Sequence, residues 1–182
     1  MVDCPSERFI AKMVTLCMQA GSLRRVIIGV MGSSHCDAEI YEHARTVGRL
    51  IAERGAIVLC GGLGGVMEAA ARGACEVGGL TVGILPGGNE RESPPNPYIQ
   101  IAIFTGLSEA RNVINVRSAD AVIAIAGGYG TLSEIALALK VGKPVILLRS
   151  WRFEPPFGEA EGVIRVARTP EEAVDLAFAL IS

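Results

Sequence analysis

Three glycine clusters, each directly after a short run of β-branched and aliphatic residues, constrain the fold of this chain more than any other feature. The clusters are Gly32-Ser33-Ser34 after 26–31, Gly61-Gly62-Leu63-Gly64-Gly65 after 56–60, and Gly127-Gly128-Tyr129-Gly130-Thr131 after 121–125. Each cluster leads into a stretch with the apolar spacing of a helix. Strands that alternate with helices predict a parallel sheet, because each crossover helix returns the chain to the same end of the sheet.

The rest of the chain continues this rhythm. Further strands are predicted at 80–85, 99–104, 145–148 and 163–166, helices at 38–54, 66–77, 108–118, 132–141 and 170–180, and a loop at 86–97. We therefore predict an α/β fold, a Rossmann-like three-layer sandwich with a mostly parallel sheet and helices on both faces. The 182 residues fit a single domain, 1–182, in which the N-terminal extension, 1–22, is expected to be helical.

The charge, cysteine and histidine content of the chain argues against several classes of function. The net charge is −2 and no Lys/Arg block occurs, so binding to nucleic acid or to a membrane surface is not expected. The five cysteines are an odd number without a CxxC pair, and no signal peptide is recognised, which predicts free thiols and a cytoplasmic location. With two histidines, no metal site is expected.

The glycine clusters are candidate phosphate-binding loops. Glycine lets backbone amides approach an anion closely, and the N-terminus of the following helix adds unpaired N–H donors. The candidate ligand-binding residues from these loops are Gly32, Ser33, Ser34, Gly61, Gly62, Gly64, Gly65, Gly127, Gly128, Gly130 and Thr131. For any one loop, the glycines could instead serve only a tight turn. The chain has neither GxxxxGK[ST] nor a good dinucleotide fingerprint, which favours a mononucleotide-like ligand over NAD.

Two charged residues near these loops have two interpretations each. Glu134 either closes a capping box, in which it reaches back to the backbone amide of Thr131, or presents its carboxylate to the pocket. Arg111 either donates two hydrogen bonds from its guanidinium to a phosphate or ribose, or forms a surface ion pair with Glu109 or Asp120.

The segment 126–134, AGGYGTLSE, resembles the hallmark PGGxGTxxE of the LOG (LONELY GUY) family, with Ala126 in place of the proline. This family, formerly labelled lysine decarboxylase, includes phosphoribohydrolases that release a base from a nucleoside monophosphate. Arg111 stands where the arginine of the second hallmark, MHxRK, is expected. Glu109 replaces the histidine of that hallmark, and Asn112 replaces the lysine.

Between residues 26 and 148 the chain is more similar to a sister group, the molybdenum cofactor carrier proteins. The similarity is carried by 61–70, 96–99, 105–107 and 110–112. Carriers of this kind hold a phosphorylated pterin at the same sheet edge and do no chemistry. The resemblance implies a Rossmann-like fold, phosphate binding with Asn112 beside Arg111 among the binding residues, and a homo-oligomer, either a dimer or a tetramer.

Two functions follow from these observations. The first is a binding protein for a phosphate-bearing ligand, a nucleotide or a phosphorylated pterin such as the molybdenum cofactor, with no other cofactor required. The alternative is a LOG-like nucleoside 5′-monophosphate phosphoribohydrolase, in which Arg111 holds the substrate and Glu134 stabilises oxocarbenium-like charge. The presence of both residues favours the enzyme, whereas the departures at 109, 112 and 126 favour the binding protein. Lysine decarboxylase activity is not expected, because no lysine lies in a glycine-rich site.

Overall fold

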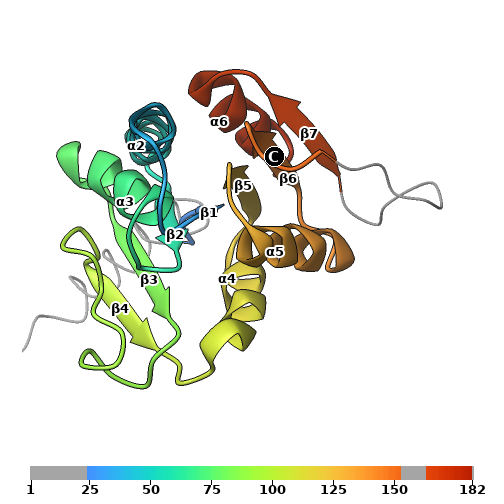
Figure 1. Ribbon diagram of the computed structural model, residues 1–182. Coiled ribbons are helices and arrows are strands. Elements are labelled where there is room, and N and C mark those ends of the chain that lie inside the picture. Colours follow the sequence, from blue (N-terminus) through green and yellow to red (C-terminus); the bar gives the residue numbers. More distant parts are fainter. Residues whose placement is uncertain (1–23, 153–162, 182) are drawn as a thin grey trace, which may run out of the picture.

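The computed structural model describes residues 24–152 and 163–181, which form one seven-stranded sheet between layers of helices (Figure 1). The strands are β1 (Ile27–Gly32), β2 (Ile57–Cys60), β3 (Thr81–Leu85), β4 (Ile101–Phe104), β5 (Ala121–Ile125), β6 (Val145–Leu148) and β7 (Ile164–Ala167). Their order is β4-β3-β2-β1-β5-β6-β7, and every neighbouring pair is parallel. The predicted α/β fold with a Rossmann-like sheet is confirmed.

The helices cover both faces of the sheet. They are α2 (Ala38–Glu53), α3 (Val66–Glu76), α4 (Asn112–Ser118), α5 (Tyr129–Lys140) and α6 (Pro170–Ala179), with a 3₁₀ turn, η1 (Ser108–Arg111), before α4. Helices α2, α3 and α6 lie on one face, and α4 and α5 lie on the other (Figure 1). None of the helices in the described parts of the chain is long and apolar enough to span a membrane. The helix predicted within 1–22 lies outside the described residues.

Alternation along the strands divides the core in two. In β1, Ile28 and Val30 pack toward α2, α3 and α6, while Met31 packs toward α4 and α5. All five residues of β5 are buried, as expected for a central strand of a parallel sheet that is covered on both faces. This double burial explains the continuous apolar runs from which the strands were predicted.

Helices α2 and α3 pack against each other through two glycines. A Cβ atom at Gly48 would collide with the backbone carbonyl of Ala70, and one at Gly73 would collide with the carbonyl of Arg45. The backbones therefore approach more closely than side chains would permit. This contact fixes the middle of α3 against α2.

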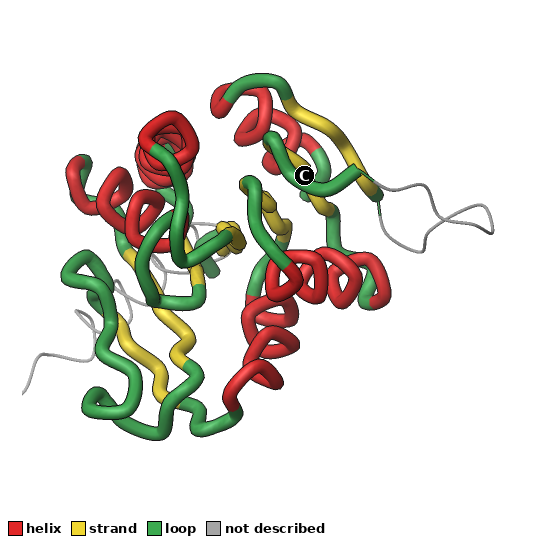
Figure 2. Tube along the Cα trace, in the orientation of Figure 1, coloured by secondary structure: helices red, strands yellow, loops and turns green. Residues whose placement is uncertain are grey.

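Two predicted helices have different boundaries in the structure. The stretch 108–118 is divided into η1 and α4 instead of forming one helix, and Ser108 has a positive φ of 50°. Helix α5 begins at Tyr129, three residues before the predicted start at 132. The stretch between β3 and β4 is loop, as predicted for the proline-rich segment 86–97 (Figure 2).

Candidate functional site

A cavity lies at the carboxyl end of the sheet, between β1 and β5. These strands are neighbours, but β1 leads into α2 on one face and β5 leads into α5 on the other. Such a reversal opens the crevice in which α/β proteins bind ligands. The cavity has a volume of about 240 Å³ and is lined by Met31, Gly32, Ser33, Ser34, Leu63, Met67, Arg111, Asn112, Gly128, Gly130, Thr131 and Glu134. The other predicted site residues lie outside this lining: Gly61, Gly62, Gly64, Gly65 and Gly127.

The second glycine loop packs against the first glycine loop and against Arg111, both of which line the cavity. Gly65 has a positive φ of 62°, and a Cβ atom there would lie 2.5 Å from the carbonyl oxygen of Ser33. The same oxygen accepts a hydrogen bond from the backbone N–H of Val66 at 3.0 Å. At Gly61, a Cβ atom would lie 2.7 Å from both terminal nitrogens of Arg111. The absence of side chains here lets the first loop and Arg111 occupy their positions.

The third glycine loop places the first turn of α5 at the cavity. Gly127 has a φ of 97°, and Thr131 packs so closely against it that a Cβ atom would collide with the threonine side chain. Gly128 is the N-cap residue of α5, and Gly130 and Thr131 line the cavity from the first helical turn. First-turn N–H groups have no partner within their own helix. The loop therefore offers hydrogen-bond donors at the edge where an anion would lie.

The proposed capping box is wrong. Because the helix begins at Tyr129, Thr131 lies inside the first turn and is not the N-cap residue. Glu134 does not reach back to its amide but accepts a hydrogen bond from the side-chain amide of Asn115 at 2.9 Å. The sequence pattern of a capping box was present, but the glycine loop started the helix three residues earlier than the pattern assumes.

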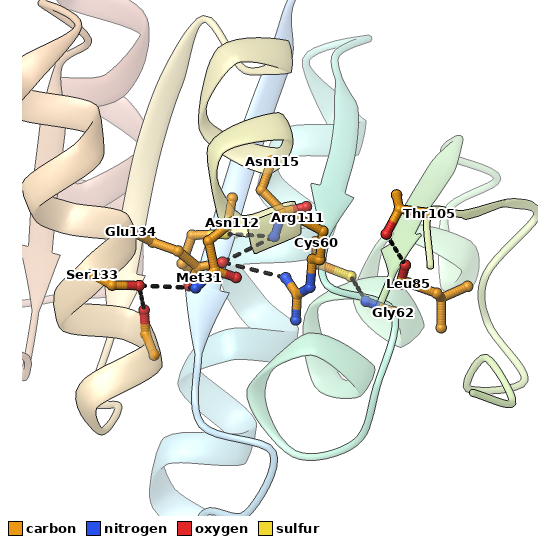
Figure 3. A network of polar contacts seen from close by, with 11 residues as sticks. Met31, Cys60, Gly62, Leu85, Thr105, Arg111, Asn112, Asn115, Ser133 and Glu134 are labelled. Carbon is orange, nitrogen blue, oxygen red and sulfur yellow. Dashed lines mark hydrogen bonds and ion pairs between the residues drawn. The ribbon is translucent and has the colours of Figure 1, made fainter. Parts of the chain in front are cut away.

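Glu134 forms a buried polar network with Arg111 and Asn115 (Figure 3). The Arg111 Nη1 atom lies 3.4 Å from Glu134 Oε1, and the two side chains are only 11% and 7% exposed. The surface alternative for Arg111 is not observed, since it pairs with neither Glu109 nor Asp120 within the described residues. Arg111 instead presents a buried positive charge to the cavity.

The burial of this network affects protonation and hydrogen bonding. Desolvation raises the pKa of the Glu134 carboxyl, although the hydrogen bond from Asn115 and the charge of Arg111 act in the opposite direction. Among the described residues, Arg111 Nε and Asn115 Oδ1 are buried without a hydrogen-bond partner. Unpaired buried polar atoms are rare in native folds. Of these two residues, Arg111 lines the cavity and Asn115 lies behind it, fully buried.

A second chain of hydrogen bonds joins α4 to the third loop. Asn112 Nδ2 donates to Ser133 Oγ at 2.8 Å, and Ser133 Oγ donates to the Gly130 carbonyl at 2.7 Å (Figure 3). Asn112 therefore lines the cavity with its amide already engaged. This contact orients the loop from the side of α4.

Sequence reasoning missed two asparagines that organise the site. Asn115 stands four residues after Arg111, a spacing that places side chains on one face of a helix and could have identified it. Asn96 is buried and donates from Nδ2 to the carbonyl of Leu63 at 2.8 Å and to that of Gly62 at 3.2 Å. Asn96 begins the segment 96–99, which carries part of the similarity to the molybdenum cofactor carrier proteins, but its contacts could not be predicted because its partners lie more than thirty residues earlier in the chain.

The backbone at Ala126 explains one departure from the LOG hallmark. Ala126 has a φ of 47°, and its N–H donates to the carbonyl of Leu148 at 3.2 Å. Proline can satisfy neither condition, because its ring holds φ near −65° and it has no N–H. The local geometry of this chain therefore excludes proline at position 126.

These features define the class of protein. It is a Rossmann-like α/β protein with a polar cavity at the switch point of a parallel sheet, formed by glycine loops, a helix N-terminus and a buried arginine–glutamate pair. The chain belongs to the SLOG cluster4 family, whose model matches residues 25–174. It is thus a member of the LOG-like superfamily, close to the molybdenum cofactor carrier proteins.

Similar proteins carry two different functional descriptions. The structure of the molybdenum cofactor binding protein from Rippkaea orientalis is 41% identical, with a TM-score of 0.79 over 88% of this chain and 100% of that one. The molybdenum cofactor carrier protein of Chlamydomonas reinhardtii is 37% identical, with a TM-score of 0.73 over 87% of this chain and 99% of its own. A cytokinin riboside 5′-monophosphate phosphoribohydrolase of Mycobacterium tuberculosis is 34% identical over 65% of this chain and 67% of its own length.

Proposed function

We propose that this protein binds a small phosphate-bearing ligand, a nucleotide or a phosphorylated pterin such as the molybdenum cofactor, in the cavity between β1 and β5. The observation that carries the proposal is the placement of the Arg111 guanidinium, 11% exposed, in the same cavity as the first turn of α5. A buried guanidinium and a helix N-terminus both favour a phosphate group. The similarity to molybdenum cofactor binding proteins supports this class of ligand.

The dimensions of the cavity suggest how such a ligand would bind. A volume of about 240 Å³ is below the range of pockets that enclose a whole drug-sized molecule, which begins at about 300 Å³. The cavity would therefore enclose the phosphate and the group attached to it, while the far end of the ligand remains exposed. The hydroxyls of Ser33, Ser34 and Thr131 are further donors for the phosphate.

Binding is tested by titration calorimetry with nucleoside 5′-monophosphates and, separately, with molybdenum cofactor released from a loaded enzyme. Arg111→Ala should weaken binding, because the charge that faces the cavity is removed. Arg117→Ala is the matched control, since Arg117 lies on α4, the helix that Arg111 precedes, but is exposed and does not line the cavity. Equal affinity of both variants for every ligand would refute the proposed site.

One observation favours the second candidate, a nucleoside 5′-monophosphate phosphoribohydrolase. The carboxylate of Glu134 and the guanidinium of Arg111 lie side by side in one cavity, and a relative with this activity is 34% identical. In the hydrolysis, water replaces the base at the anomeric carbon, and the products are ribose 5-phosphate and the free base. Arg111 would hold the phosphate or ribose, and Glu134 would stabilise positive charge that develops on the sugar.

Release of free base from AMP and related monophosphates separates the two candidates. For an enzyme, wild type turns over while Glu134→Gln and Arg111→Ala lose nearly all activity and unfold at near-normal temperatures. For a binding protein, wild type releases no base and Glu134→Gln retains affinity for the ligand. Turnover that persists in Glu134→Gln would contradict the catalytic assignment.

The remaining proposals concern the protein in its environment. We infer a cytoplasmic homo-oligomer, a dimer or a tetramer, that binds neither nucleic acid nor membranes and needs no cofactor beyond its ligand. Light scattering at micromolar protein concentration tests the assembly, and a monomer would contradict it. The inference on assembly rests on the family resemblance and on the abundance of apolar helix faces in a small chain.

A further inference from the structure

A second cavity lies at the same end of the sheet, at the carboxyl ends of β6 and β7. It has a volume of about 460 Å³. Strands β6 and β7 form the edge of the sheet opposite β4 (Figure 1). The floor of the cavity is apolar, with Leu147 from β6 and Val166 from β7, which is 58% exposed. Its rim is basic, with Arg149, Arg152 and Arg168.

Only one of the three guanidiniums is paired with a carboxylate of the described residues. Arg149 forms an ion pair with Glu39 at 2.7 Å, and both side chains are more than half exposed. Neither Arg152 nor Arg168 forms an ion pair with a carboxylate of the described residues, and the nearby Glu172 accepts instead from the backbone N–H of Arg168. Exposed arginines gathered around one cavity favour an anion such as phosphate, because each planar guanidinium offers paired donors to its oxygens.

An aromatic pair separates this cavity from the first. The rings of Tyr129 and Trp151 have centroids 6.0 Å apart at an angle of 36°, and Tyr129 is 84% exposed. Trp151 lines the second cavity, and its indole N–H donates at 3.3 Å to the carbonyl of Gly128, which lines the first. A large exposed aromatic surface beside basic side chains suits a ligand with a planar ring and an attached anion.

The backbone at the second cavity is held in an unusual conformation. Arg149 has a positive φ of 49°, like Ala126 at the end of the neighbouring strand, and the Ser150 hydroxyl donates to the Ala126 carbonyl at 2.7 Å. A non-glycine residue in the left-handed region costs free energy, and such residues concentrate at functional sites. The conformation turns the segment 149–152 so that its side chains surround the cavity.

We propose that the second cavity is a binding site for a small molecule that carries a phosphate on a planar ring. The apolar floor and Trp151 receive the ring, and the guanidiniums of Arg152 and Arg168 receive the phosphate. This site is separate from the cavity between β1 and β5. Its existence does not depend on the function proposed for that cavity.

Trp151 provides a direct readout, because it is the only tryptophan in the chain. Phenyl phosphate, a ring with one phosphate, is titrated into the full-length protein while tryptophan fluorescence is followed. We expect a saturable change, and the double variant Arg152→Gln/Arg168→Gln should weaken binding by about tenfold or more, since the charged donors to the phosphate are removed. Arg165→Gln is the matched control, because Arg165 lies on β7, three residues before Arg168, but does not line the cavity.

Further arms of the same titration can overturn the proposal. Phenol that binds as tightly as phenyl phosphate would show that the guanidiniums contribute nothing. A response that is lost in Arg111→Gln but kept in Arg152→Gln/Arg168→Gln would place the ring in the first cavity. No saturable change with wild type would also refute the site. Circular dichroism of each variant establishes that it is folded.

Discussion

Replacement of Gly128 by leucine should separate ligand binding from folding. Gly128 lines the first cavity, and a Cβ atom there would meet no atom within 4 Å. Its backbone angles, φ −101° and ψ −152°, are open to any residue. The Cβ atom of a leucine therefore has room, and the rest of the side chain occupies the space through which a phosphate would approach the first turn of α5.

The expected magnitudes follow from this geometry. Leucine is a poorer N-cap residue than glycine, so Gly128→Leu should lower the free energy of unfolding by no more than about 1 kcal/mol. Loss of even one hydrogen bond to a charged phosphate, about 1.5–3 kcal/mol, raises the dissociation constant at least about tenfold. Gly127→Ala offers a contrast, because its positive φ and its collision with Thr131 should damage the loop itself.

Urea unfolding measures the stability of each variant. Titration calorimetry measures its affinity for the ligand that wild type binds most tightly. Gly130→Ala serves as a stability reference: residue 130 is helical with open space around its Cβ position, so the variant should gain about 0.5–1 kcal/mol. If Gly128→Leu is folded and binds every phosphorylated ligand as tightly as wild type, the third loop is not the phosphate cradle.

Three further predictions concern the rest of the fold. Gly48→Ala should destabilise by about 1–3 kcal/mol in urea unfolding despite the better helix propensity of alanine, because its Cβ collides with the carbonyl of Ala70; a gain in stability would contradict the tight α2–α3 contact. Ala126→Pro should lose about 3 kcal/mol or more by the same measurement, since it removes the N–H bond to Leu148 and cannot adopt the positive φ, whereas Ala126→Gly should be neutral or stabilising. Burial raises the pKa of Glu134, so its contribution to stability is present at low pH and lost as the pH rises above the ordinary glutamate pKa through the raised one. Wild type should therefore lose more unfolding free energy than Glu134→Gln as the pH rises above the ordinary glutamate pKa, and parallel pH profiles would refute this assignment.

The order of strands and helices could be predicted because each element carries a local pattern. Short β-branched runs, helical apolar spacing and glycine clusters act within about ten residues, which is the range over which sequence periodicity is informative. The parallel arrangement followed from their alternation. The same patterns located the loops at one edge of the sheet and identified Arg111 and Glu134 as candidate site residues, because carboxyl ends of parallel strands share that edge.

The partners of these residues could be decided only by the tertiary structure. Whether Glu134 closes a capping box or enters a buried network depends on where α5 begins and on Asn115, which approaches from another helix. Which glycines line the cavity and which support it depends on contacts between loops that are distant in sequence, such as that of Gly65 with Ser33. Local propensity specifies the elements, but the burial, charge and protonation of a side chain depend on what packs against it, and that is decided by the packing of the layers.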